Sequence, residues 1–346
     1  MYVAPRPKAS DDPYFAVRLS LGCIVAVVVA VLIQSKMPML IPALTVGLMG
    51  GMRKSFDLAK AIGGPLVLIV SISVFYLLIS LVHVMPAIEL VVVFSLGCLA
   101  YYIILRTGNP VGMLLLISIT LMSVMGAKSF QAMVIIKDAF IEGALTALLV
   151  IPVLYWLLPS VAKTPLAEEY RPDPHGYHWQ RAAIRSLVML LLLAWLYTVL
   201  DTSNMILAMA AVFALVFPSR QQQFAEAKER SYATFIGGML ALTILSLTTW
   251  VGHLSILLAL LFLAGLFLGD RMMHGSHPPM VYQFAFSVLI ALTIGSFTNQ
   301  EPVSSTFLRI TLTLIGAISA AYLSALLELL LLPKLQIPAD LAKNPD

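Results

Sequence analysis

The sequence predicts an all-α polytopic membrane protein with about twelve transmembrane helices, arranged as two parallel six-helix repeats. Apolar residues make up 60% of the chain and charged residues 11%, against about 45–50% and about 25% in soluble domains. The apolar residues gather in blocks that approach the ~20 residues needed to cross a bilayer. One long polar run separates two such groups of blocks, so the chain divides into similar halves.

This polar run covers residues 159–180 and contains four prolines, charges of both signs and no apolar periodicity. Proline at that density excludes a long helix, and we interpret the run as a solvated linker. The predicted organisation is a cytoplasmic segment at 1–14, a first repeat at 15–158, the linker, a second repeat at 181–332 and a cytoplasmic tail at 333–346.

Each half contains six apolar blocks. The second block of each half is too short to cross comfortably as a straight helix. The predicted spans are 15–33, 37–52, 59–82, 86–105, 109–127, 130–158, 181–200, 204–217, 231–251, 254–269, 278–296 and 304–332.

Basic residues fix the expected orientation. If the N-terminus is cytoplasmic, seventeen of the 21 lysines and arginines fall on that side and only Lys36 and Lys128 on the other. Because cytoplasmic loops are enriched in these residues, we expect both termini in the cytoplasm, and the alternation from loop to loop favours an even number of spans.

Four positions in the first half match four positions in the second half at nearly constant separations of 167, 174, 168 and 174 residues, which favours a duplication. The matched positions are Arg18 with Arg185, Gly63-Gly64 with Gly237-Gly238, Asn109-Pro110 with His277-Pro278, and Pro159 with Pro333. Six spans per unit bring both halves into the membrane from the same side, so the repeat is parallel, as in one class of transporters.

Several functional classes are excluded. The basic residues form no continuous patch, so no nucleic-acid partner is expected. Cys23 and Cys98 lie inside apolar spans without metal-ligand spacing, which argues against a disulfide or zinc site. No phosphate-cradling, HExxH or nucleophile motif is present, so we predict neither an enzyme nor a bound cofactor or metal.

The motifs together resemble the fusaric-acid-resistance and aromatic-acid exporter superfamily. They are an arginine that opens the first span, a short second span, a basic loop (52–56 and 220–224) and Gly-Gly in the third span. The chain is similar to a short member, because the large cytosolic domain of long members is missing. The resemblance implies proton-driven export of organic acids or similar toxic compounds across the bacterial inner membrane, often together with a periplasmic membrane-fusion protein.

Ionisable residues within spans are the candidates for chemistry, because a charge in lipid is costly. In the sixth span, Asp138 and Glu142 are four residues apart and share one helix face. At ~1.5 Å per residue, Glu142 lies ~20 Å from the start of the helix, near mid-bilayer. Burial and a neighbouring acid favour the protonated carboxyl, so Glu142 is the leading proton-coupling candidate and Asp138 the second. The alternative is a structural, hydrogen-bonded Glu142.

Cations at similar depth in the two sixth spans, Lys137 and Arg309, would suit an anionic substrate. Snorkelling towards headgroups is the competing explanation. For Arg18 and Arg185, near the start of their spans, the alternatives are headgroup anchoring and an anion-attracting vestibule. Glu328, close to the end of its span, is expected at the interface.

The second span, 37–52, contains Pro38, Pro42 and three glycines. We therefore predict a broken helix whose free backbone groups line the substrate site, with Pro42 at that site.

The functional prediction is a proton-coupled exporter of aromatic or amphipathic organic acids, binding a small-molecule substrate between the halves. The alternatives are a passive anion channel and a non-transporting accessory or scaffold subunit. Homo-oligomerisation and the need for a periplasmic partner are left open.

Overall fold

The computed structural model describes residues 12–53, 55–109, 111–161, 177–199, 220–250, 253–296 and 302–331. These residues form eleven α-helices and no β-strand. The helices are α1 (Phe15–Leu32), α2 (Leu40–Gly50), α3 (Leu58–Val82), α4 (Pro86–Thr107), α5 (Val111–Lys128), α6 (Phe130–Leu157), α7 (His178–Val199), α9 (Arg220–Trp250), α10 (Leu254–His274), α11 (Pro279–Ser296) and α12 (Pro302–Leu331).

Each of these helices overlaps one predicted span. Within the described residues, seven of them contain stretches long and apolar enough to cross a membrane, and the protein is accordingly a polytopic α-helical membrane protein. The predicted span at 204–217 lies outside the described residues, so the count of twelve stays a prediction.

Local sequence explains where several helices begin and end. The Asp57 side chain accepts hydrogen bonds from the amides of Ala59 and Lys60 and so caps α3. Ser129 caps α6 by accepting from the amide of Ala132. Helix α4 starts with Pro86 and stops at Gly108, whose φ of 65° is the left-handed conformation that glycine adopts readily at a helix end.

The later helices of the two halves pack in corresponding ways. In the first half α3 contacts α5 and α6, and α4 contacts α5. In the second half α9 contacts α11 and α12, and α10 contacts α11. The first helix of each half also contacts the last, α1 with α6 and α7 with α12.

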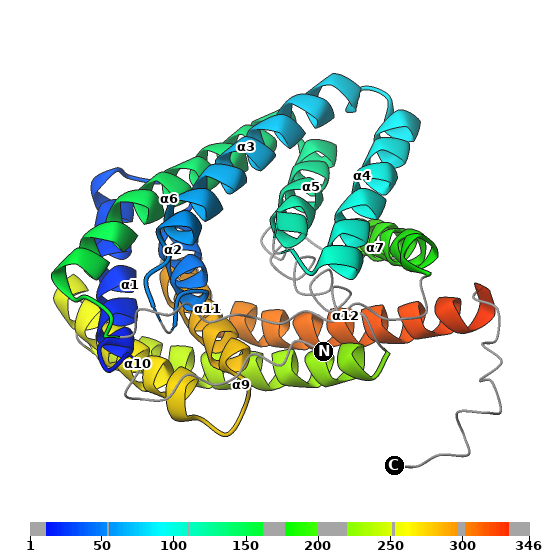
Figure 1. Ribbon diagram of the computed structural model, residues 1–346. Coiled ribbons are helices and arrows are strands. Elements are labelled where there is room, and N and C mark those ends of the chain that lie inside the picture. Colours follow the sequence, from blue (N-terminus) through cyan, green and yellow to red (C-terminus); the bar gives the residue numbers. More distant parts are fainter. Residues whose placement is uncertain are drawn as a thin grey trace, which may run out of the picture.

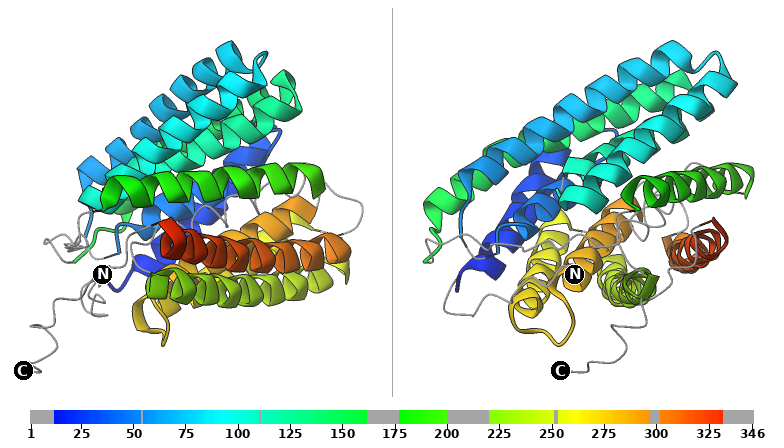
Figure 2. Two further views of the ribbon diagram at one scale, coloured as in Figure 1. Left: turned by 90° about the vertical axis from the view of Figure 1, so that its right-hand side faces the viewer. Right: turned by 45° about the vertical axis from the view of Figure 1, so that its right-hand side comes forward.

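The opening helix of each half additionally packs against the helix of the fourth predicted span of the other half. Helix α1 lies along α10 and helix α7 lies along α4, so that the two halves interlock (Figures 1 and 2). A glycine brings each pair close together. A Cβ atom added at Gly97 on α4 would lie 2.6 Å from Oγ of Ser186 on α7, and one added at Gly265 on α10 would lie 2.7 Å from Oγ of Ser20 on α1.

Exposed apolar side chains follow one face of the longest helices. On α3 they recur at Leu66, Val70, Val74 and Leu77. On α6 they recur at Leu145, Leu149, Val153 and Trp156. A stripe of large apolar residues facing outward is the surface that a bilayer covers, while small and polar residues gather between the helices.

Candidate functional site

Glu142 lies near the middle of α6 and faces the connection between α1 and α2. Its carboxylate accepts a hydrogen bond from the Ser35 hydroxyl, with 2.6 Å between Oγ and Oε2. The residue is half-buried. Helices α1 and α6 run antiparallel, because Arg18 near the start of α1 contacts Leu158 at the end of α6, while Ser35, just after α1, contacts the middle of α6. Glu142 therefore meets a non-helical segment.

This turn, residues 33–39, contains three consecutive polar residues, Gln34, Ser35 and Lys36, of which Gln34 and Lys36 are exposed. Gln34 has a φ of 51°, the left-handed conformation that reverses the chain after α1. The Ser35 amide then donates to the carbonyl of Ala30, and its hydroxyl is free to turn towards Glu142. Lys36 is exposed beside them, so the turn gives Glu142 a polar border where a helix would have offered apolar side chains.

Lys137 and Asp138 pair with each other one turn earlier on α6. Lys137 Nζ lies 3.0 Å from Asp138 Oδ1 and 4.7 Å from the centre of the Tyr76 ring on α3. The Asp138 side chain is 51% exposed and that of Lys137 23%. Lys137 is therefore partly neutralised by its neighbour, and an incoming anion would compete with Asp138 for it.

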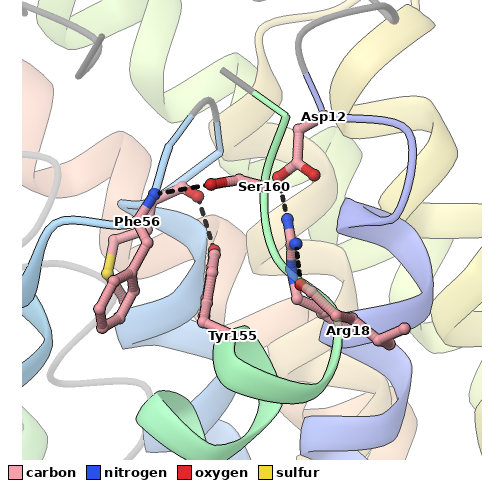
Figure 3. A network of polar contacts seen from close by, with 7 residues as sticks. Asp12, Arg18, Phe56, Tyr155 and Ser160 are labelled. Atoms are coloured by element: carbon pink, nitrogen blue, oxygen red, sulfur yellow. Dashed lines mark hydrogen bonds and ion pairs between the residues drawn. The ribbon is translucent and has the colours of Figure 1, made fainter. Parts of the chain in front are cut away.

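Arg18 is fully buried at the end of the bundle where α1 begins and α6 ends, which we call the N-terminal face. It pairs with Asp12, donates to the Leu158 carbonyl at 2.5 Å and lies 4.2 Å from the centre of the Tyr155 ring (Figure 3). Burial raises the pKa of Asp12 above the ordinary range, and the nearby Arg18 guanidinium only partly offsets this.

Tyr155 extends this network to the loop between α2 and α3. Its hydroxyl donates to the Met52 carbonyl at 2.7 Å, and its ring packs against Phe56, with centroids 4.9 Å apart. The Phe56 amide donates in turn to the Ser160 hydroxyl at 3.2 Å (Figure 3). The predicted basic loop of the first half is thus tied to the end of α6.

Arg185 occupies the corresponding place in the second half. It is fully buried and its Nη2 lies 3.5 Å from Oε1 of Glu328 on α12, itself 3% exposed. Glu328, expected at the interface from its place near the end of its span, is thus enclosed by protein, and its partner on α7 cannot be read from its position within that span. Headgroup anchoring of Arg18 and Arg185 is contradicted, since both side chains are buried among protein groups.

Pro42 does not break α2. It is buried at the third position of the helix, where a missing amide removes no intrahelical hydrogen bond. The free backbone group lies further along. The Gly51 amide donates to Leu48, and the carbonyl of Gly47 accepts from Gln283 Nε2 on α11 at 3.0 Å.

The sequence analysis missed Gln283, although the signal was present as a lone amide side chain within an apolar span. It also missed Ser35, which gave no signal because it lies in a connecting turn. Arg309 is on α12, but its side chain lies outside the described residues. The structure brings Glu142 together with Ser35, and Lys137 with Asp138, but it places Arg18 and Arg185 in separate clusters.

Among the described residues, no group of histidine, cysteine, aspartate or glutamate has the arrangement of a metal site. Cys23 and Cys98 are buried free thiols.

Comparison with known proteins identifies one family. Residues 190–323 match the family model described as fusaric acid resistance protein-like. Searches of curated proteins and of solved structures returned no match. The matched region runs from within α7 to within α12, and it supports, as the sequence motifs predicted, the membership of this chain in the fusaric-acid-resistance superfamily.

Proposed function

We propose that the protein is a proton-coupled exporter of aromatic or amphipathic organic acids, with Glu142 as the residue that carries the proton. The observation that carries the proposal is the hydrogen bond from Ser35 to Glu142 in the middle of α6. An acid within a span, bordered by a non-helical turn whose Gln34 and Lys36 are exposed, has both the water access and the hydrogen-bonding partner that reversible protonation requires.

We further propose twelve spans in two parallel repeats, with both termini cytoplasmic. The reciprocal packing of α1 with α10 and of α7 with α4 supports a two-fold relation between the halves. Gly97 and Gly265, which make these two contacts, are 168 residues apart, the same separation as Asn109 and His277. The domain boundaries given above follow from this arrangement.

The substrate would bind near Lys137, a half-buried cation five residues before Glu142 on α6. Because Asp138 already holds Lys137, a substrate carboxylate must offer a second favourable contact, and the Tyr76 ring next to Lys137 can supply it to an aromatic acid. A periplasmic partner is expected from the family alone.

The test is uptake of labelled aromatic carboxylates into everted membrane vesicles with an imposed inside-acid gradient. Accumulation should collapse when the gradient is dissipated, and Glu142→Gln, which cannot release a proton, should lose at least about tenfold of the gradient-driven rate. Asp138→Asn is the matched comparison, because it removes an acid from the same helix face without touching Ser35. It should keep the dependence of transport on the gradient, while the apparent affinity for the carboxylate rises because Lys137 loses its competing partner.

Downhill flux that is unchanged by Glu142→Gln would contradict the proton-coupling role and favour the passive anion channel. No flux with any compound would leave the accessory-subunit alternative in place of the exporter.

A further inference from the structure

We propose that Gln283 is a latch that holds the end of α2 against α11, and that this contact between the two halves must open during transport. The inference rests on the proposed transport function, but the structural part of it can be judged without a substrate.

The latch begins with a backbone group that α2 leaves unused. In an α-helix the amide of residue 51 would donate to the carbonyl of residue 47, but the Gly51 amide donates to Leu48 at 3.3 Å. The Gly47 carbonyl accepts instead from Gln283 Nε2 at 3.0 Å. A side chain of the second half therefore completes the last turn of a helix of the first half.

The sequence of α2 makes room for this side chain. A Cβ atom added at Gly50 would overlap the Gln283 amide, whereas one added at Gly47 would meet no atom within 4 Å. Of these two glycines on one helix, only Gly50 is required by the contact. The amide packs into a place that no larger residue on α2 would leave open.

The position of the contact favours a moving part. It joins α2 to α11, and it lies at the N-terminal face, where α1 also meets α10. A single hydrogen bond contributes little net free energy, so it can open at a cost that substrate binding would offset. The short α2, preceded by the turn that contacts Glu142, is the element that could carry such a movement from one face to the other.

Hydrogen exchange of the purified protein in lipid nanodiscs tests the latch itself. Gln283→Met keeps the length of the side chain but cannot donate, and Gly50→Ala displaces the amide, so both should speed exchange of the amides at residues 50–52 about fivefold. Gly47→Ala, which meets open space, should leave the rate unchanged. Equal rates in all four proteins would overturn the latch.

Gln283→Glu adds a readout that a purely structural role would not move. A carboxylate cannot donate to the Gly47 carbonyl, but a protonated carboxyl can. Exchange of the amides at residues 50–52 in this variant should therefore match that of wild type at low pH and be faster than that of wild type at high pH. Ser287→Ala, one turn along α11, is the control, because the Ser287 hydroxyl bonds only to the carbonyl of Gln283, and it should show no such difference.

A reversible cross-link tests the need to open. With Cys23 and Cys98 replaced by alanine, cysteines at positions 50 and 283 should form a disulfide under oxidation, stop flux in vesicles and release it on reduction. A disulfide that forms while flux continues would show that the latch need not open during transport. If wild-type protein shows no flux, the exporter proposal fails, and the exchange experiment still decides whether Gln283 is a latch.

Discussion

Arg185 and Glu328 place two opposite charges among the packed helices, where each would be costly alone. Both side chains are almost fully buried, and they join α7 to α12. A buried pair is a weak source of net stability, because desolvation offsets the attraction, but removing one partner leaves an uncompensated charge. The pair therefore has its largest effect when only one of its residues is changed.

We predict that Arg185→Met or Glu328→Leu alone lowers the free energy of unfolding by about 3–5 kcal/mol, while the double substitution costs much less than the sum. Thermal unfolding in detergent would measure this. Lys60→Met, at an exposed position at the start of α3, is the control and should change little. Additive effects of the two single substitutions would show that the two residues do not act as a pair.

For individual residues, the sequence predicted the types of the candidate functional residues better than it predicted their contacts and burial. The depth of Glu142 along α6 followed from helix geometry, but its bond to Ser35 joins residues 107 positions apart, and no local pattern encodes such a contact. The burial of Arg18 was missed because its partner Asp12 belongs to a segment that shows no apolar periodicity.

The helices α4 and α7 approach closely because a glycine on one faces a serine on the other. Oγ of Ser186 lies 2.6 Å from a Cβ built on Gly97 and donates to the Phe94 carbonyl at 2.8 Å. Small residues allow helix backbones in membranes to come together and exchange such bonds. This contact couples the first helix of the second half to the fourth helix of the first half.

Gly97→Ala should destabilise the protein by about 1–3 kcal/mol through overpacking, and Ser186→Ala in the same chain should recover part of the loss, since it removes the overlapping hydroxyl. Gly63→Ala is the matched control, because an added Cβ there meets open space. The midpoint of thermal unfolding would measure each effect. Equal losses at Gly97 and Gly63 would contradict close packing of α4 on α7.

Helices were predicted well and their ends less well. Hydropathy starts the third span of the second half at residue 231, but α9 begins at Arg220. The charged residues before 231 continue the helix, and hydropathy detects only the part suited to lipid. The prediction that the second span is short was correct, but its stated cause was wrong. Helix α2 is short because it begins after a turn, and Pro42 does not interrupt it.

For the whole molecule, the interlocking of α1 with α10 and of α7 with α4 means that neither half buries its opening helix by itself. We predict that residues 1–168 and 169–346, expressed separately, are degraded or aggregate, whereas co-expression gives a complex that purifies through a tag on either piece. Stable accumulation of one half alone, with a cooperative unfolding transition, would contradict this prediction.

The duplication was predicted from spacings along the sequence, but the exchange of opening helices was not. Matching positions show that two segments resemble each other, and they carry no information about which copy a helix packs against. That choice depends on side-chain contacts such as the one between Gly265 and Ser20.

The interlocking also sets an order of events during biosynthesis. Helix α1 leaves the ribosome first, while its partner α10 starts at Leu254, and at about 5–20 residues per second this delay is on the order of 10–40 s. Throughout that interval the face of α1 that carries Ser20 has no α10 to cover it. The nascent chain must therefore hold an unfinished first helix in the membrane until most of the protein has been translated, which makes this interval the one in which insertion factors or membrane proteases can act on it.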